Sequence, residues 1–418
     1  MDAFVIRGGR PLFGTVRVGG AKNAALPLLF ATMITRGVSR IHRVPDIRDV
    51  HAAFSILEGF GARVYCVKDG TYDIDTTHLT YTVADAALVQ SMRASTYLLG
   101  ASLSRFGRAV LQPFGGCAFS ARPIDMHLGA ARAFGATVEG DTILAPSLVG
   151  GHVIFPKISV GATVNALLLA ATAKGKSTLE NVALEPHVGA LIDYLRAAGA
   201  DITAEGGRIT VNGGAPLHGA EVEVVADMIE AGTYLMCGLM TGGCVRVDGV
   251  PTEQLSALCD TLAHAGCYIR LRPTDLSVYG TLSKRLSVTA APYPAFATDL
   301  QPPCAALMAA HAGGEILDTV FPERYGYIET LRAFGVQANI RHPILRIEPS
   351  RLHAACVRAP DLRGGAAALL CALAAEGESR IDDAHLLLRG YEHLTQKLAA
   401  IGADIRAESP CGDAPVLV

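Results

Sequence analysis

The sequence predicts an α/β protein with two inside-out α/β domains, each built from three repeated βαβαββ-type units. Three observations predict this fold class. One helix–glycine–strand phrase recurs six times along the chain, a second phrase alternates with it, and the helices of both are rich in Ala and Leu. A chain of 418 residues that is 50% apolar is long enough for about two or three domain cores.

The first phrase is a short helical segment that ends at a glycine and runs into a β-rich strand, as in LRAAGADITAE. Its copies recur with a period of about 65 to 70 residues, which suits one compact supersecondary unit. We expect each glycine to end its helix as a C-cap. The six glycines are Gly61, Gly135, Gly199, Gly266, Gly335 and Gly402.

The second phrase is an Ala/Leu-rich helix that ends at a glycine before an alternating strand, as in LMAAHAGGEILDTV. A single unit cannot bury such a helix, so the units must pack together with helices inside and sheets outside. The termini lack polar capping repeats, which disfavours an open solenoid and favours three plus three units around two axes. The marker glycines are Gly37, Gly107, Gly175, Gly243, Gly314 and Gly377.

The repeats divide the chain into two domains. Residues 21–227 form the first three-repeat domain, and residues 228–418 form the second. The stretch before residue 227 is rich in Gly and Pro and precedes a new helix, which marks a crossing between the halves. Residues 1–20 are expected to form a hairpin-like pair of strands that completes the second domain.

Charge and hydropathy exclude several classes of protein. Lys plus Arg number 36 against 39 Asp plus Glu, a net charge of −3, so no global basic field favours nucleic acid or an anionic membrane. The longest apolar stretches, such as Ala24 to Ile34, are much shorter than a membrane-spanning helix. The N-terminus lacks the pattern of a signal peptide. We expect a cytoplasmic protein with small-molecule substrates and no nucleic-acid or membrane partner.

The ten cysteines do not form a metal or disulfide pattern, because no C-x-x-C and no paired Cys/His spacing occurs. No metal is therefore expected. Cys237, Cys304 and Cys371 lie in apolar helical runs and are expected in the core. Cys117 differs, because glycines and a proline surround it in QPFGGCAFSARP. Nearby cations would lower the pKa of such a thiol and make it reactive, although an incidental loop cysteine is the alternative.

Four cationic residues suggest a site that binds an anion. Lys22 follows two glycines and opens an apolar helix, so its ammonium and free backbone N–H groups meet where an anion would sit. Arg122 precedes a proline that favours a loop, and its guanidinium can bind a phosphate or carboxylate. Arg363 and Arg389 are similar candidates. For each cation the alternative is an ordinary solvated or salt-bridged side chain.

Asp299 has two interpretations. As a carboxylate it can serve as a positioned acid or base, and it can cap the helix that begins at LQPPCAALMAA; both can be true.

Six motifs in order along the repeats carry a resemblance: GGAKNAALPLL at 19–29, GGCAFSARPIDMHL at 115–128, SVGAT at 159–163, YPAFATDLQP at 293–302, DLRGG at 361–365 and RGYEHL at 389–394. The chain resembles the enolpyruvyl transferase family, in the branch that uses UDP-N-acetylglucosamine for peptidoglycan precursors. The resemblance implies the two-domain inside-out fold, an active site between the domains, and no cofactor. It also implies phosphoenolpyruvate and UDP-N-acetylglucosamine as substrates and fosfomycin as an inhibitor.

The resemblance also implies roles for individual residues. It assigns Lys22 and Asn23 to phosphoenolpyruvate, Arg389 to the carboxylate of that substrate, and Cys117 to general-acid protonation of the methylene carbon. Asp299 would deprotonate the acceptor 3-hydroxyl or hold it in line. The residues implied for binding phosphate, nucleotide or sugar are Arg93, Arg122, Pro123, Ile124, Asp125, Met126, Lys157, Ile158, Ser159, Val160, Val320 and Arg363.

Two positions depart from the family pattern. Met228 stands where an Arg is usual, and Leu388 stands where an Asp usually precedes the Arg that is here Arg389. These departures keep two alternatives open. One is an enolpyruvyl transferase that acts on a nucleotide such as UMP in secondary metabolism, and the other is a catalytically silent homologue that binds a UDP-sugar.

Overall fold

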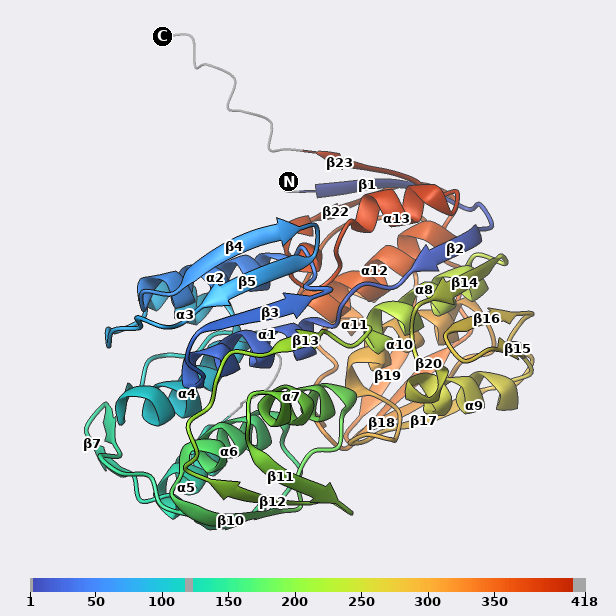
Figure 1. The fold of residues 1–418 in the computed structure, drawn as a ribbon. Coiled ribbons are helices and arrows are strands. Elements are labelled where there is room, and N and C mark those ends of the chain that lie inside the picture. Colours follow the sequence, from blue (N-terminus) through green and yellow to red (C-terminus); the bar gives the residue numbers. More distant parts are fainter. Residues whose placement is uncertain (1–2, 117–122, 409–418) are drawn as a thin grey trace, which may run out of the picture. The chain divides into compact units, whose positions relative to one another are not determined.

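The computed structural model describes residues 3–116 and 123–408 (Figure 1). The chain forms two compact units. Unit 1 combines Met1–Gly19 with Ala226–Val418, and unit 2 is Gly20–Val225. Each unit carries its own buried apolar cluster.

Unit 2 alternates helices with short strands. Its helices are α1 (Lys22–Ala31), α2 (Arg48–Gly59), α3 (Ala86–Ser91), α4 (Tyr97–Phe106), α5 (Asp125–Ala133), α6 (Val160–Thr172) and α7 (Pro186–Ala197), with 3₁₀ turns η1 (Thr32–Ile34) and η2 (Arg93–Thr96). Its strands are β3 (Val38–His42), β4 (Arg63–Lys68), β5 (Thr71–Asp75), β6 (Arg108–Val110), β7 (Thr137–Glu139), β8 (Thr142–Leu144), β9 (His152–Ile154), β10 (Gly175–Glu180), β11 (Asp201–Glu205), β12 (Arg208–Gly213) and β13 (Glu221–Glu223).

Unit 1 repeats the same alternation. Its helices are α8 (Met228–Met240), α9 (Ser256–His264), α10 (Gln301–Ala310), α11 (Ile328–Arg332), α12 (Leu362–Ala374) and α13 (Leu394–Ala400), with 3₁₀ turns η3 (Thr252–Leu255), η4 (Thr298–Leu300) and η5 (Ala384–Arg389). Its strands are β1 (Ala3–Gly8), β2 (Phe13–Arg17), β14 (Cys244–Asp248), β15 (Tyr268–Leu271), β16 (Asp275–Tyr279), β17 (Leu286–Ala290), β18 (Gly314–Asp318), β19 (Gln337–Arg341), β20 (Ile344–Glu348), β21 (Cys356–Arg358), β22 (Gly377–Asp382) and β23 (Asp404–Glu408).

The sheets repeat one topology. In the described part of the chain, five four-stranded sheets join one parallel pair to two antiparallel pairs, as in β17-β18-β20-β19, and β6-β8-β7 has three strands. The expected N-terminal hairpin is wrong. β1 pairs with β22 and β23, whereas β2 pairs with β14. The two strands therefore complete different sheets of unit 1, because its last and first repeats each lack a strand of their own.

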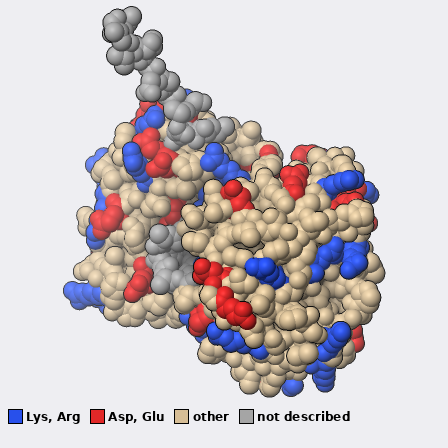
Figure 2. Space-filling model, turned by 90° about the vertical axis from the view of Figure 1, so that its left-hand side faces the viewer, with Lys and Arg blue, Asp and Glu red and all other residues tan. Residues whose placement is uncertain are grey.

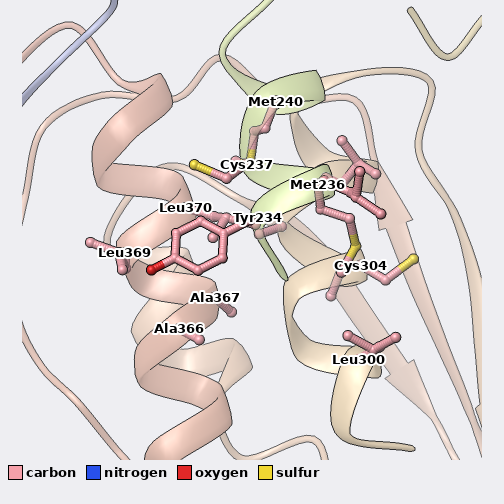
Figure 3. Close-up of a cluster of buried hydrophobic side chains, with 14 of the residues drawn as sticks. Tyr234, Met236, Cys237, Met240, Leu300, Cys304, Ala366, Ala367, Leu369 and Leu370 are labelled. Atoms are coloured by element: carbon pink, nitrogen blue, oxygen red, sulfur yellow. The ribbon is translucent and has the colours of Figure 1, made fainter. Parts of the chain in front are cut away.

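One apolar helix from each repeat is buried inside its unit. Helices α8, α10 and α12 of unit 1 bury nearly every residue, as do α1 and α6 of unit 2. Figure 3 shows the contact between three of them: Tyr234 of α8 lies beside Leu370 of α12, and Met236 of α8 lies beside Cys304 of α10. Strands such as β17 alternate buried and exposed residues. The predicted α/β repeat fold with buried helices is confirmed.

The glycines of the first phrase closely follow helices as predicted, but in the second phrase only Gly107 is a C-cap. Gly175 and Gly377 are the first residues of β10 and β22, and Ala173 and Ala375 cap the helices before them. All six glycines of the first phrase have positive φ, and so do Gly37, Gly107, Gly175 and Gly377 of the second. In the other two repeats the left-handed residue is one position earlier, at Gly242 and Gly313. Gly243 and Gly314 are required for a different reason. A Cβ atom there would lie 2.0 Å from the carbonyl oxygen of Leu12 and 2.4 Å from that of Leu286.

Two further sequence expectations concern the core cysteines and membrane-spanning helices. Cys237, Cys304 and Cys371 are free, buried thiols, and burial raises the pKa of each well above that of a reactive cysteine. In the portion of the chain that the structure describes, no helix combines the length and apolar character that crossing a bilayer requires.

Candidate active site

One ionic group of unit 1 is a carboxylate held by two buried arginines. Asp299 lies in η4, directly before α10. Its Oδ1 accepts a hydrogen bond from Nη1 of Arg324 at 2.8 Å, and its Oδ2 accepts one from Nε of Arg363 at 3.0 Å. The two arginine side chains are only 4% and 3% exposed, whereas the Asp299 side chain is 27% exposed. The carboxylate thus reaches the surface while its cations are buried.

This arrangement corrects the capping interpretation of Asp299. The first turn of α10 receives no hydrogen bond from a side-chain cap. The carboxylate instead uses both of its oxygens for arginines that lie 25 and 64 residues away in the sequence. Asp299 is therefore part of an ionic group rather than a helix cap.

The arginines determine the protonation of Asp299. Burial raises the pKa of its carboxyl, but attraction to Arg363 and Arg324 and their hydrogen bonds outweigh burial and hold the pKa well below its usual range. Burial lowers the pKa of Arg363, but Asp299, together with Tyr391 and Asp227, more than reverses that shift. Asp299 is therefore an anion at neutral pH, and it is a weak base while both arginines are bound to it.

Neighbouring residues fix the arginines in place. Asp361 caps α12 by accepting hydrogen bonds from the backbone N–H groups of Arg363 and Gly364 at 2.8 and 3.1 Å. Nη1 of Arg324 also donates to Oγ1 of Thr298 at 3.2 Å. The geometry of the group thus depends on a helix cap and on a turn rather than on flexible surface side chains.

The loop that contains Val320 is attached to the same group. Asp318 accepts hydrogen bonds from the backbone N–H groups of Val320 and Phe321 at 2.9 and 2.8 Å. It also accepts one from the hydroxyl of Thr298 at 2.5 Å. Thr298 therefore joins this loop to the turn that carries Asp299.

Arg389 ends η5 and is followed by a segment that packs tightly on α12. A Cβ atom at Gly390 would lie 2.7 Å from a methyl carbon of Leu362, so a larger residue between Arg389 and Tyr391 would have to displace that side chain. Leu388 packs against the apolar core of unit 1, as does Met228 at the start of α8. The two residues that the resemblance marks as departures are thus core contacts of unit 1.

In unit 2, Lys22 is the first residue of α1, as predicted. Its Nζ lies 2.7 Å from Oδ2 of Asp49 on α2, and the side chains of the two residues are 12% and 4% exposed. Asn23 beside it is exposed. The ammonium at this helix start already has one buried carboxylate partner, so an anionic ligand would share Lys22 with Asp49.

A second group in unit 2 joins the starts of three helices. Arg93 opens η2 ahead of α4, and His127 lies in the first turn of α5. His127 also approaches Gly161 at the start of α6, where a Cβ atom would lie 2.9 Å from its Nε2. Burial, and then the charge of Arg93, lower the pKa of His127 to about 4. The imidazole is therefore neutral at pH 7, and its buried Nδ1 has no hydrogen-bond partner in the described part of the chain.

The remaining predicted residues of unit 2 lie around these helix starts. Ser159 caps α6 by accepting a hydrogen bond from the N–H group of Ala162 at 3.4 Å. The other predicted residues that directly precede or begin α5 and α6 are Pro123, Ile124, Asp125, Met126, Lys157, Ile158 and Val160. Helix N-termini carry partial positive charge and unpaired N–H groups, so this part of unit 2 suits a phosphate-containing ligand.

Cys117 and Arg122 lie outside the described residues. The two glycines before Cys117 are described and are held closely. A Cβ atom at Gly115 would lie 1.7 Å from the carbonyl oxygen of Gln90, and one at Gly116 would lie 2.8 Å from Cβ of Arg93. Gly116, the last described residue before this gap, therefore lies directly beside Arg93.

Sequence reasoning missed four residues of these groups: Arg324, Asp49, His127 and Tyr391. Arg324 and Asp49 are ordinary charged residues in the sequence, and only the fold gives them partners. His127 and Tyr391 stand inside the motifs GGCAFSARPIDMHL and RGYEHL, so their place in those motifs was the available signal.

The residues described in the structure contain no group of three His, Cys, Asp or Glu side chains that could hold a metal ion. On the face shown in Figure 2, Lys and Arg side chains lie scattered among Asp and Glu side chains. Anion binding on that face would therefore depend on local groups of residues rather than on one extended basic surface.

Comparisons with known proteins agree over nearly the whole chain. The family model described as EPSP synthase (3-phosphoshikimate 1-carboxyvinyltransferase) matches residues 6–398. A UDP-N-acetylglucosamine 1-carboxyvinyltransferase of Chlorobium limicola is 40% identical, covering 98% of this chain and 99% of the relative. A relative of the same name numbered 2, from Clostridium acetobutylicum, is 37% identical over 98% of this chain and 100% of its own.

Solved structures show the same architecture. The enolpyruvyl transferase NikO from Streptomyces tendae has a TM-score of 0.85 and 28% identity, covering 97% of this chain and 98% of its own. EPSP synthase from Acinetobacter baumannii has a TM-score of 0.73 at 19% identity, covering 97% of this chain and 100% of its own, which supports the fold alone.

Proposed function

This chain belongs to the EPSP synthase family of enolpyruvyl transferases, and we propose that it transfers the enolpyruvyl group of phosphoenolpyruvate to the 3-hydroxyl of UDP-N-acetylglucosamine, releasing phosphate. The observation that carries this choice of acceptor is the identity of 37 to 40% over the full length of relatives named for that reaction. The identity to NikO is lower, at 28%. The proposal places the reaction in the cytoplasm, in peptidoglycan precursor synthesis.

The chemistry needs cations for the phosphate and carboxylate, a proton donor for the methylene carbon, and an acceptor for the hydroxyl proton. Lys22 and Asn23 would bind phosphoenolpyruvate in unit 2, with Arg122 on a phosphate, and Arg389 would bind the substrate carboxylate in unit 1. The helix starts around Arg93 and His127 would hold the nucleotide diphosphate.

In the addition step, the acceptor oxygen bonds to C2 of phosphoenolpyruvate while Cys117 gives its proton to C3. The hydroxyl proton passes to Asp299. In the elimination step, a C3 proton returns to the Cys117 thiolate, the C2–C3 double bond re-forms, and the bond between C2 and the phosphate oxygen breaks. The proton held by Asp299 passes to the leaving phosphate, so both residues regain their starting protonation states. The products are the enolpyruvyl ether and inorganic phosphate, so atoms and electrons balance without an oxidant, a metal or a cofactor.

The ionic group of Asp299 limits when this residue can accept the hydroxyl proton. While both arginines bind its carboxylate, the low pKa of Asp299 makes it a weak proton acceptor. A substrate phosphate or carboxylate that competes for Arg324 or Arg363 would weaken those bonds and raise the pKa of Asp299. We propose that Asp299 first orients the hydroxyl and accepts its proton only after an anionic substrate has bound.

The likeness to NikO and two residues of unit 1 favour a second candidate for the enolpyruvyl acceptor. NikO matches the fold closely, and Met228 and Leu388 replace residues that are charged in the usual pattern. The second candidate function is enolpyruvyl transfer to a nucleotide such as UMP. A protein that binds the nucleotide sugar without turnover is the third.

Phosphate release separates the three functions. We expect phosphate from phosphoenolpyruvate with UDP-N-acetylglucosamine and none with UMP. Phosphate release with UMP alone would support the second function. Absence of release with both, together with calorimetric binding of UDP-N-acetylglucosamine, would support the silent homologue and contradict our proposal. A Cys117→Ala variant is the control for contaminating phosphatase.

A further inference from the structure

Tyr391 is a buried residue that contacts the ionic group of unit 1 but has no assigned role. Its side chain is 1% exposed. The guanidinium carbon of Arg363 lies 5.4 Å from the centre of its ring, within the range of a cation–π contact. Tyr391 follows Arg389 by two residues, in a segment packed tightly on the start of α12. The ring thus contacts Arg363 and belongs to the same short segment as Arg389.

The ring itself is fixed by a directional hydrogen bond. The hydroxyl oxygens of Tyr391 and Thr233 lie 3.0 Å apart. The hydroxyl of Thr233 already donates its one hydrogen to the carbonyl of Ile229, at 2.8 Å. Thr233 therefore accepts from Tyr391, and the phenol is tethered to the first turns of α8. Since burial raises the pKa of Tyr391, the phenol stays neutral, and Asp299 remains the counter-charge of Arg363.

The tether leaves one donor of Arg363 without a partner. The Nε of Arg363 donates to Asp299, and its backbone N–H donates to Asp361. Its Nη1 is buried and has no hydrogen-bond partner among the residues that the structure describes. Buried guanidinium donors are nearly always paired, so an unpaired one beside a partly exposed carboxylate points to a missing ligand. An anion would supply the acceptor that Nη1 lacks.

We propose that Tyr391 is a positioning residue: its ring holds the guanidinium of Arg363 so that one edge binds Asp299 and Nη1 is presented to the phosphate or carboxylate of phosphoenolpyruvate. This inference rests on the proposed function. The aromatic face is the main support, because it covers the flat guanidinium, and the hydroxyl adds a weaker hydrogen bond to Arg363. The hydroxyl is secondary, since its bond to Thr233 mainly fixes the ring.

The test compares Tyr391→Leu, which removes the aromatic face, with Tyr391→Phe, which keeps it. We expect Tyr391→Leu to raise the KM for phosphoenolpyruvate about tenfold or more, as expected for a lost desolvated cation–π contact. The KM for UDP-N-acetylglucosamine should stay within about twofold, since Arg363 would not bind that substrate through Nη1. Tyr391→Phe should remain close to the unchanged enzyme for both substrates.

Tyr234 provides a matched control. It is another fully buried tyrosine in the same helical core, and its hydroxyl has no hydrogen-bond partner among the described residues (Figure 3). Tyr234→Leu should lower thermal stability without changing the ratio of the two KM values. If Tyr391→Leu does not fold, Tyr391→Met replaces it, because Met fills most of the volume without an aromatic face.

Three results would overturn the proposal: an unchanged KM for phosphoenolpyruvate in Tyr391→Leu, an equal rise in both KM values, or equal damage in Tyr391→Phe. Failure of the proposed function would look different, because the unchanged protein would then release no phosphate. In that case calorimetric titration with inorganic phosphate still tests Tyr391. Binding weakened in Tyr391→Leu and retained in Tyr391→Phe supports the role, and equal binding in all three proteins refutes it.

Discussion

Removing the charge of Asp299 should destabilise unit 1 strongly and should make it respond to phosphate. Asp299→Asn keeps the shape of the side chain but leaves Arg324 and Arg363 without a counter-charge, although their side chains are only 4% and 3% exposed. Removing one partner of a buried ion pair typically costs about 3 to 5 kcal/mol. Because the Asp299 side chain is 27% exposed, water moderates the loss, and we expect roughly 2 to 3 kcal/mol.

Hydrogen exchange measured by mass spectrometry suits this prediction. The chain has no tryptophan to report unfolding by fluorescence, and hydrogen exchange reports on its two compact units separately. Peptides from α10 should exchange faster in the variant, while peptides from α1 in unit 2 should not change. The measurement belongs at pH 7. The lowered pKa of Asp299 means that its contribution is complete above the ordinary carboxyl range and is lost only as the pH falls below it.

Inorganic phosphate should then protect the variant more than the unchanged protein, because phosphate does not have to displace a carboxylate from the arginines. Glu348→Gln is the control. It breaks a two-bond contact with Arg285, also in unit 1, at 2.7 and 3.2 Å, but both side chains are about half exposed. It should leave exchange of α10 unchanged. A loss below about 1 kcal/mol in Asp299→Asn, or faster exchange in unit 2 as well, would refute the reasoning.

Three further predictions concern unit 2. Because the folded-state pKa of His127 is lowered to about 4, unfolding free energy should fall by roughly 3 kcal/mol as the pH drops from 6.5 to 4, and urea denaturation of His127→Gln should show a flatter profile. Gly100→Ala should destabilise by about 1 to 3 kcal/mol in urea, since its Cβ would lie 2.8 Å from Oδ1 of Asn165. Fosfomycin, an epoxide, should add one mass increment at Cys117 in intact-mass measurement, faster with UDP-N-acetylglucosamine present.

Each of these has its own control. Gly129→Ala in α5 meets nothing within 4 Å and should be neutral or stabilising, so equal losses in both alanine variants would contradict the packing argument. A pH profile that His127→Gln leaves unchanged would assign the pH dependence to another group. Cys66 is an exposed thiol, and Cys66→Ser should still be labelled by fosfomycin, whereas Cys117→Ser should not. Labelling of both variants would contradict the role of Cys117.

The sequence determined the features that depend on neighbours along the chain. Helix ends marked by glycine, the apolar helices and the alternating strands follow from local conformational preference and from periodicity, so the sixfold repeat and its α/β class could be read directly. The start of α1 at Lys22 followed for the same reason. Even there the predicted positions were accurate only to about one residue, since Gly242 and Gly313, rather than Gly243 and Gly314, take the left-handed conformation.

Only the tertiary structure decided which distant side chains meet. The sequence could not show that β1 pairs with β22 and β23 while β2 pairs with β14, because strand pairing depends on which sheet edge is open when the repeats pack. It identified Asp299 and Arg363 but not Arg324, and it offered a base or a helix cap for Asp299 without predicting the ionic group. That group depends on burial: two guanidinium groups excluded from water need a common counter-charge, and the fold brings Asp299 to both.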